Sequence, residues 1–170
     1  LPERYDERIL GRLGVEVALV HEERIRGTAG GVAGAERALG AGEVLVVNGD
    51  TLAELDLAAL LASHRRRRAY ATLALTVGLA PGAGTVGHGQ DGRIVRLRAG
   101  RFGRELSGGD FVGAQVLSER ARADLPTEGC LVADVYLPAL ARGELVAAEP
   151  LASAFSDVGT PAAYLAANLH

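Results

Sequence analysis

The chain has 170 residues, enough for one domain with a hydrophobic core and too few for two ordinary domains. Its formal net charge is −3, so electrostatics give it no reason to bind a polyanion, and a nucleic acid is not an expected partner. The single cysteine, Cys130, excludes an internal disulfide and a cysteine-based metal cluster. Its apolar surroundings in the sequence favour a buried packing role.

Arginine supplies all 18 basic residues, since the sequence contains no lysine. A GC-rich genome explains this bias more simply than a function does. The consequence is that no lysine of this chain can grip a phosphate or form a Schiff base. No apolar run reaches the length of a membrane-spanning helix and no signal-peptide pattern is present. The expected compartment is therefore the cytoplasm, without a membrane partner.

The elements predicted for the first half of the chain alternate between helices and strands. They are a polar helix over 2–13, a strand over 16–20, a glycine-rich turn over 27–31 with a helix to about residue 39, a strand over 44–47 and a helix over 55–67. The apolar, β-branched run at 44–47 predicts a strand buried on both faces. Asp56 is the expected cap of the next helix, and arginines suit its C-terminus. Such alternation implies right-handed crossovers and a parallel sheet.

The second half adds antiparallel pieces. Predicted there are strands over 70–77, 111–117, 145–148 and 155–158, a hairpin of 86–88 and 94–97, and helices over 118–125, 131–141 and from Pro161 to residue 169 with Thr160 as N-cap. The glycine-rich stretches 81–84 and 100–109 are expected to be loops that could act as lids. Without repeats or a low-complexity linker, residues 1–170 form one predicted domain with a mixed sheet.

Two acidic residues follow predicted strands, where ligands bind in open α/β sheets. Asp50 ends the apolar strand after Gly49, and Asp157 ends the last strand just before Gly159. If they converge, their oxygens suit a hard cation such as Mg²⁺, which keeps phosphate oxygens in its shell. A turn residue and a helix cap are the alternative roles for Asp50 and Asp157. Their pairing favours the metal site.

The turn at 27–31 also lies where a ligand could bind, because amides at the start of a helix attract an anion or a base edge. Its sequence is neither Gly-x-Gly-x-x-Gly nor a P-loop, which would need a lysine. An ordinary strand-to-helix turn explains it nearly as well.

Taken together, the ordered segments resemble the sugar-1-phosphate nucleotidyltransferase family. The segments that carry the resemblance are Gly27-Thr28-Ala29-Gly30-Gly31, Val46-Val47-Asn48-Gly49-Asp50, His64, Gly92-Arg93-Ile94, Phe111-Val112-Gly113, Asp157-Val158-Gly159-Thr160-Pro161, Tyr164 and Asn168. The resemblance runs from Leu1 to His170. It implies an α/β, three-layer αβα Rossmann-like nucleotide-diphospho-sugar transferase fold with a mixed, mostly parallel sheet.

The resemblance also implies a reaction and a site. A sugar-1-phosphate oxygen attacks the α-phosphorus of a nucleoside triphosphate and pyrophosphate leaves, with Mg²⁺ neutralising the developing charge. The implied roles are nucleotide binding for Gly27, Thr28, Ala29, Asn48 and Gly49, catalytic metal binding for Asp50 and Asp157, and sugar contact for Gly113. The implied partners are the nucleoside triphosphate and the sugar 1-phosphate.

Two departures from the family pattern stand out. The family begins with a strand and a glycine-rich loop that grips the triphosphate, and neither precedes Leu1, so the domain is expected to lack this front segment. The family commonly has Glu-Lys-Pro after the Gly-Arg-Ile strand, where this chain has Arg98-Ala99-Gly100-Arg101. Arg98 and Arg101 are therefore the candidates for binding the sugar phosphate, although a guanidinium does not simply replace an ammonium.

Two other functions stay open. One is a non-catalytic relative that binds a nucleotide or sugar nucleotide and regulates or scaffolds a partner, which the lack of lysine and of the signature loop would suit. The other is a GT-A glycosyltransferase, which expects an Asp-x-Asp motif where this chain has Asn48-Gly49-Asp50. The sequence identifies neither the nucleobase nor the sugar. It also leaves the oligomeric state open, with a homo-oligomer among the alternatives.

Overall fold

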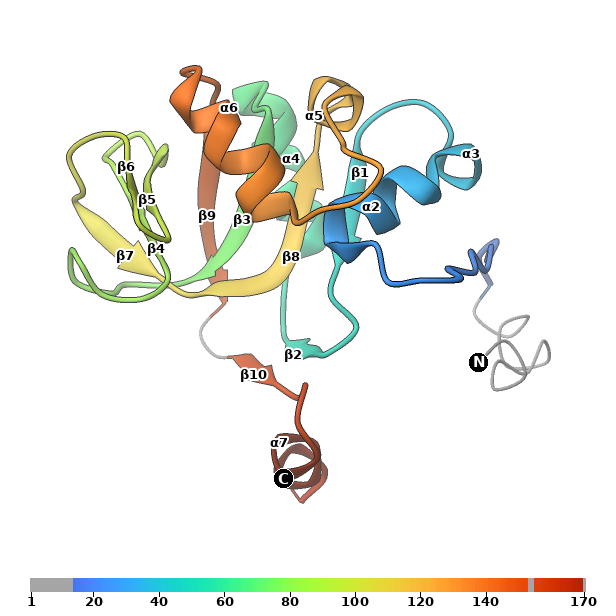
Figure 1. Ribbon diagram of the computed structural model, residues 1–170. Coiled ribbons are helices and arrows are strands. Elements are labelled where there is room, and N and C mark those ends of the chain that lie inside the picture. The colour runs from blue at the N-terminus through green and yellow to red at the C-terminus, as the bar shows by residue number, and fades with distance from the viewer. Residues whose placement is uncertain (1–13, 153–154, 170) are drawn as a thin grey trace.

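A computed structural model describes residues 14–152 and 155–169, so the helix expected over 2–13 lies outside the described residues. A central four-stranded sheet has helices on both faces, and a second four-stranded sheet stands beside it (Figure 1). Below the central sheet lie a two-stranded ladder and the C-terminal helix. The expected three-layer α/β fold with a mixed sheet is confirmed.

The central sheet has the strand order β1-β8-β3-β9. Its strands are β1 (Val44–Val47), β8 (Phe111–Leu117), β3 (Ala71–Thr76) and β9 (Val146–Ala152). Strand β8 pairs antiparallel with both β1 and β3, whereas β3 and β9 pair in parallel. Three of the four strands therefore run the same way and β8 runs against them, which is the mixed, mostly parallel arrangement that was expected.

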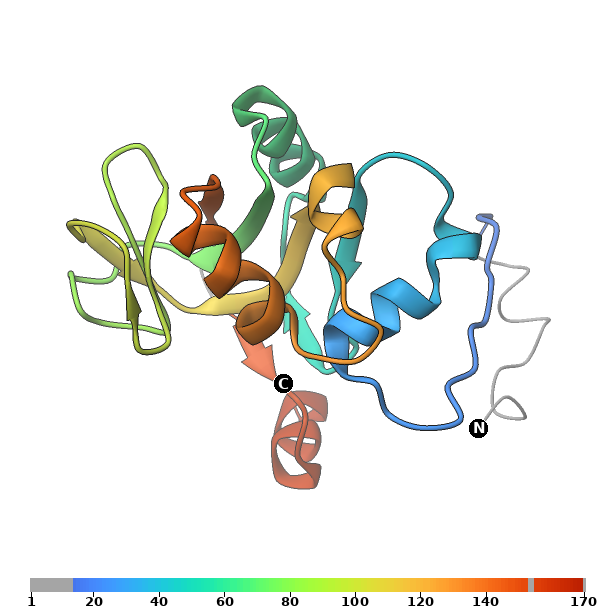
Figure 2. The same cartoon turned by 45° about the horizontal axis from the view of Figure 1, so that its top comes forward.

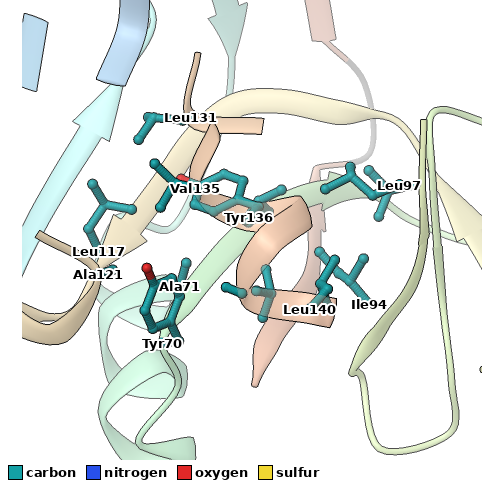
Figure 3. Close-up of a cluster of buried hydrophobic side chains, with 14 of the residues drawn as sticks. Tyr70, Ala71, Ile94, Leu97, Leu117, Ala121, Leu131, Val135, Tyr136 and Leu140 are labelled. Carbon is teal, nitrogen blue, oxygen red and sulfur yellow. The ribbon is translucent and has the colours of Figure 1, made fainter. Parts of the chain in front are cut away.

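Two hydrophobic clusters lie on opposite faces of this sheet. On one face, Leu60 of α4 (Leu57–Arg67) packs with small strand residues such as Ala74 and Ala114. The larger cluster, on the other face, joins the central sheet to the second sheet through Tyr136 and Leu140 (Figure 3). Both tyrosine hydroxyls of this region have partners, since Tyr136 donates to Gln115 Oε1 at 2.7 Å and Tyr70 donates to Asp124 Oδ2 at 2.8 Å. The core therefore stays apolar without orphaned phenols.

Four of the other described helices contribute to the larger cluster, namely α2 (Gly27–Gly34), α5 (Glu119–Ala123), the π-helix η3 (Leu131–Tyr136) and α6 (Leu137–Ala141). The short helix α3 (Glu36–Leu39) follows α2 and has no buried residue. The single helix expected over 131–141 is thus present, but its first part is wound as a π-helix. Pro138 lacks the amide that would continue the α-helical ladder back to residue 134, which accounts for the change of winding there.

Local capping chemistry sets the helix starts as expected. The α4 cap Asp56 accepts from the amide of Ala59 at 2.8 Å, and Ser118 before α5 accepts from the amide of Ala121 at 3.2 Å. Thr160 caps α7 (Pro161–Asn168) with an acceptor distance of 3.2 Å. None of the helices in the described ranges is long and apolar enough to cross a membrane.

The second sheet corrects the prediction of a loop over 100–109, because residues 100–101 and 107–109 are strands whereas 102–106 form the loop. Its order is β6-β5-β4-β7, with β4 (Val86–His88), β5 (Ile94–Leu97), β6 (Gly100–Arg101) and β7 (Ser107–Gly109). The β4–β5 hairpin was expected, whereas β6 and β7 lack the apolar alternation that would reveal a strand. Gly108 explains part of this composition, because a Cβ there would overlap the carbonyl oxygen of Ala83.

Two further expectations are corrected near the start of the described chain. Residues 16–20 form no strand, because they are exposed and pair with no strand among the described residues. The turn expected over 27–31 is already helical, since α2 begins at Gly27 itself. Gly27 has a φ of 75°, which makes this start a glycine-dependent position.

Strand β1 is found where it was predicted, but it is not buried on both faces. It forms an edge of the central sheet, and its side chains alternate between the two faces. Leu45 is 39% exposed and Val47 is 53% exposed. A short apolar edge strand without proline or charge is a template for pairing with another chain.

We expect Val47→Lys to reduce self-association of the 170-residue chain without lowering its stability, because the charge falls on the exposed face of an edge strand. Light scattering after size exclusion measures the effect as a larger monomer fraction. Val77→Lys is the matched control, since Val77 is 50% exposed away from β1. An equal gain from both variants would contradict an edge-specific effect.

Candidate metal and nucleotide site

The structure brings the loop after β1 together with the end of the chain. The strands β2 (Thr51–Ala53) and β10 (Phe155–Asp157) form an antiparallel ladder in which Asp157 is paired with Thr51. One residue further along, the amide of Val158 donates to the carbonyl oxygen of Asp50 at 2.8 Å. Asp50 and Asp157, which are 107 positions apart in the sequence, therefore lie on neighbouring segments.

Both carboxylates approach the same point beside Gly159. A Cβ placed on Gly159 would lie 3.0 Å from Asp157 Oδ1 and 3.4 Å from Asp50 Oδ2. The amide of Gly159 donates to Asp157 Oδ1 at 2.8 Å, which orients that carboxylate. Both acidic residues are exposed, so a ligand can reach them from solvent. The missing side chain at Gly159 leaves the space between the two carboxylates open.

This donor set fits a hard cation that keeps part of its own shell. In the described ranges, no cluster of three or more histidine, cysteine, aspartate or glutamate residues could hold a metal ion. Asp50 and Asp157 would therefore supply two oxygen ligands and leave the other positions to phosphate oxygens and water. Mg²⁺ is commonly bound in this manner, by one or two carboxylates together with substrate phosphates.

Gly113 holds the loop that carries Asp50 against the central sheet. Its φ is 77°, and its carbonyl oxygen accepts from the amide of Asn48 at 2.8 Å. A Cβ at Gly113 would lie only 2.6 Å from Thr51 Oγ1. Glycine is thus required both for the backbone conformation and for the close approach of the loop. The sugar contact expected of Gly113 stays a prediction.

The segment Gly27-Thr28-Ala29 forms a second cluster, at the start of α2. The amide of Ala29 donates to the carbonyl oxygen of Gly129 at 3.0 Å, and Thr28 Oγ1 accepts from the amide of Leu131 at 3.1 Å. A Cβ on Gly27 would overlap the same Gly129 oxygen. Because the Ala29 amide already has a partner, a nucleobase at this turn would have to bind to the other polar groups of residues 27–29.

The two arginines expected at the sugar phosphate have different surroundings. Arg98 is exposed, with a φ of 50°, and its Nη2 lies 3.5 Å from Cys130 Sγ. Cys130 adjoins Leu131, so Arg98 belongs to the same cluster as Thr28. Arg101 instead turns back on its own loop, where Nη1 donates to the carbonyl oxygens of Arg98 at 3.1 Å and Gly100 at 3.0 Å. The structure therefore favours Arg98 over Arg101 as a ligand-binding group.

Cys130 is half-buried, so the buried packing role expected of it is confirmed only in part. Burial acts to raise the pKa of the thiol, but the backbone amides of Ala133 and Val132 and the charge of Arg98 outweigh it and lower that pKa overall. Its position at the start of η3 exposes it to unpaired amides. Sequence reasoning missed this surrounding, although an apolar helix directly after a cysteine was the available signal.

A buried ion pair, which the sequence did not reveal, fixes the loop over 81–84. Arg96 donates to both oxygens of Glu105, at 2.8 and 3.0 Å, and to the carbonyl oxygens of Gly84 at 2.9 Å and Ala83 at 2.6 Å. Glu105 Oε1 also accepts from the amide of Gly82 at 2.7 Å. The loop is therefore tied to β5 and forms a fixed wall, so the structure gives no support to the expected lid at 81–84.

The carboxylate pair and the α2 cluster lie at the same end of the central sheet, the lower end in Figure 1. The β1–β2 loop and the start of α2 are also close together in the turned view of Figure 2. This end is where β1 and β3 finish, and ligands of open α/β sheets bind beyond such carboxyl ends. The two clusters therefore lie at the end of the sheet where a ligand is expected to bind.

Comparison with known proteins identifies the family of the chain. A family model described as nucleotidyl transferase matches residues 3–170. The chain belongs to the nucleotidyl transferase family. The resemblance seen in the sequence to the sugar-1-phosphate nucleotidyltransferases is thereby confirmed at the level of the family.

Individual relatives match parts of the chain. The mannose-1-phosphate guanylyltransferase of Mycobacterium tuberculosis (strain ATCC 25618 / H37Rv) is 40% identical over 84 residues, which are 49% of this chain and 23% of that protein. The match to this relative therefore spans less than a quarter of its length.

Solved structures share the fold. HddC from Yersinia pseudotuberculosis complexed with GMP-PN has a TM-score of 0.71 at 23% identity, covering 95% of this chain and 70% of that one. A second HddC structure has a TM-score of 0.70 at 22% identity, with coverages of 96% and 73%. The chain thus shares its fold with these two structures.

We expect Gly113→Ala to destabilise the chain by about 2 kcal/mol or more, because it adds a clash with Thr51 to the strain of a positive φ. Chemical denaturation measures the change. Gly143→Ala is the matched control, since Gly143 has a φ of 82° but a Cβ there meets no described atom within 4 Å. Equal losses for the two variants would show that the contact with the loop contributes nothing.

A second prediction concerns acid. The hydrogen bonds from Arg96 lower the pKa of Glu105 below its ordinary value of 4.5, against the effect of burial. The carboxyl group of Glu105 therefore binds a proton more readily in the unfolded chain than in the folded one. Its contribution to stability is complete above about pH 4.5 and is lost as the pH falls through the lower pKa of the folded state.

Glu105→Gln should therefore weaken the dependence of the free energy of unfolding on pH in this acidic range. It should also cost about 3 kcal/mol at neutral pH, because Arg96 would remain buried without its charged partner. Denaturation curves at a series of pH values test both points, with the exposed Glu54→Gln as control. An unchanged slope in Glu105→Gln would contradict the prediction.

Proposed function

We propose that the protein transfers a nucleotidyl group from a nucleoside triphosphate to a sugar 1-phosphate, giving an NDP-sugar and pyrophosphate. The observation that carries this proposal is the convergence of Asp50 and Asp157 beside Gly159, in a chain that belongs to the nucleotidyl transferase family. Two exposed carboxylates at the carboxyl end of a mixed sheet suit a Mg²⁺ ion that the substrates complete.

In this proposal Asp50 and Asp157 hold the Mg²⁺ ion, which neutralises charge on the phosphates when it is bound. The backbone of Asn48 and Gly49 borders the ion, while Gly27, Thr28 and Ala29 face the nucleobase. Catalysis then consists mostly of positioning and electrostatic stabilisation. A general base is not required, because the attacking phosphate oxygen is already an anion.

The sugar phosphate is assigned to Arg98, with the backbone of Gly113 beside the sugar. Arg98 presents a planar fork of donors that can bind two phosphate oxygens at once. Its contact with Cys130 places it next to the segment proposed for the base. Arg101, which donates to carbonyl oxygens of its own loop, is the weaker candidate.

We expect Asp50→Asn and Asp157→Asn each to lower kcat/KM about 100-fold or more, because each removes a charged oxygen that stabilises developing charge. The assay measures pyrophosphate release by the protein with Mg²⁺, a sugar 1-phosphate and each nucleoside triphosphate in turn. Glu54→Gln, on β2's exposed continuation, is the matched control and should keep its activity.

Undiminished turnover in both aspartate variants would remove the metal assignment. Binding of a nucleotide without pyrophosphate release under any substrate combination would favour the other candidate, a non-catalytic member of the family. The absence of lysine from this chain is the observation that keeps this candidate in view.

A further inference from the structure

The loop that leads from α5 into η3 passes the start of α2 (Figure 2). Three hydrogen bonds join the two segments, and two of them are the bonds of Ala29 with Gly129 and of Thr28 with Leu131. In the third, the amide of Gly129 donates to the carbonyl oxygen of Arg26 at 2.8 Å. Thr28 and Leu131 are 103 positions apart. The start of α2 is therefore positioned by a segment that is distant in the sequence.

Glycines allow the two segments to approach each other closely. A Cβ on Gly27 would overlap the carbonyl oxygen of Gly129, and a Cβ on Gly30 would lie 2.7 Å from the carbonyl oxygen of Thr127. Ala29, between these glycines, is fully buried and belongs to the larger hydrophobic cluster. The contact is thus a packed backbone interface, in which a shift of the loop also moves the start of α2.

The peptide group between Gly129 and Cys130 connects Asp134 to this interface. Its carbonyl oxygen accepts from the amide of Ala29 at 3.0 Å, and its N–H donates to Asp134 Oδ2 at 2.7 Å. Because a peptide group is planar, the carboxylate that fixes the direction of the N–H also fixes the direction of the oxygen. A charged acceptor makes the stronger kind of hydrogen bond and polarises the peptide, which makes the oxygen a better acceptor for Ala29.

The backbone around this peptide group accommodates the carboxylate. Gly129 has a φ of 150°, and a Cβ there would lie only 2.6 Å from Asp134 Oδ2. Any other residue at this position would therefore displace the carboxylate. On the other side, the amide of Asp134 donates to the carbonyl oxygen of Cys130 at 2.8 Å, so the first turn of η3 holds the backbone of Asp134 in place.

We propose that Asp134 is a positioning residue for nucleotide binding, which acts through the peptide group after Gly129 and keeps the start of α2 in its binding conformation. The inference rests on the proposed function, from which it takes the assignment of residues 27–29 to the nucleobase. Asp134 has no part in the transfer step. Its loss therefore weakens nucleotide binding and leaves turnover unchanged.

A purely structural role makes a different prediction. A carboxylate that accepts from an amide at the start of a helix also stabilises that helix, in the manner of a capping box. If Asp134 did only this, its loss would lower the stability of η3 and leave nucleotide binding as it is. The two roles are separated by comparing the KM of the nucleotide with kcat and with the free energy of unfolding.

Asp134→Ala removes the acceptor and should raise the KM of the nucleoside triphosphate about tenfold at unchanged kcat, as loss of one hydrogen bond to a charged group does. Asp134→Asn keeps an oxygen acceptor and should limit the rise to about threefold, because a neutral acceptor is roughly half as strong. Asp91→Ala is the matched control, since the exposed Asp91 accepts from the amide of Arg93 at 3.0 Å in a turn of the second sheet. Its KM should not change.

Hydrogen exchange reports on the proposed connection itself. In Asp134→Ala the amide of Ala29 should exchange about tenfold faster, because the oxygen that protects it is no longer fixed. Asp91→Ala should leave this rate unchanged. An unchanged exchange rate in Asp134→Ala, a fall in kcat without a rise in KM, or a loss of stability alone would overturn the positioning role.

A calorimetric titration with Mg²⁺ and each nucleoside triphosphate in turn, without a sugar phosphate, separates this inference from the transfer reaction. Weaker binding by Asp134→Ala in the absence of any pyrophosphate release would refute the transfer reaction and support the positioning role. Equal Kd values for Asp134→Ala and the unsubstituted protein, or no measurable binding by either, would overturn the positioning role whatever the turnover. Circular dichroism and thermal unfolding establish that each variant is folded.

Discussion

The short ladder between β2 and β10 is the interaction on which the site depends. Three residue pairs and the bond from the Val158 amide to the Asp50 carbonyl oxygen join two segments that are far apart in the sequence. Without this ladder, nothing would hold the loop that carries Asp50 next to the C-terminal segment that carries Asp157. The position of both carboxylates thus follows from backbone pairing, and Gly159 adds the space between them.

A two-stranded ladder is marginally stable by itself, so the support around it matters. Phe155 of β10 packs against the cluster beneath α4, and Gly113 fixes the loop that enters β2. The buried core lies further away, under Leu73, Tyr136 and their neighbours. This arrangement separates two tasks, because the core sets the sheet while small, exposed contacts set the distance between the carboxylates.

Local chemistry was the part of this fold that sequence reasoning predicted well. Asp56, Ser118 and Thr160 cap helices through bonds to amides three residues away, and such bonds depend on the neighbouring sequence alone. Strand β8 was predicted with its observed limits because its apolar run is long. Strands β6 and β7 were missed, since their pairing is set by distant partners and not by their own residues.

In the candidate site, too, sequence reasoning predicted some features and missed others. Asp50 and Asp157 were expected to converge because strand ends share an edge of a sheet, but they meet through the separate β2–β10 ladder. The ion pair of Arg96 and Glu105 was missed because it depends on how the second sheet folds back on itself. Arg98 and Arg101 could not be told apart by sequence, because the positive φ at Arg98 turns Arg101 onto its own loop.

The terminal helix α7 follows the ladder directly and has no buried residue of its own. Its order therefore depends on the few contacts that hold β10 in place. A cation held by Asp50 and Asp157 would tie those contacts together, and by linkage it would stabilise α7 as well. Occupancy of the metal position and protection of the amides of α7 against hydrogen exchange would then rise and fall together. Hydrogen exchange at the C-terminal helix would therefore report whether the two carboxylates hold a cation.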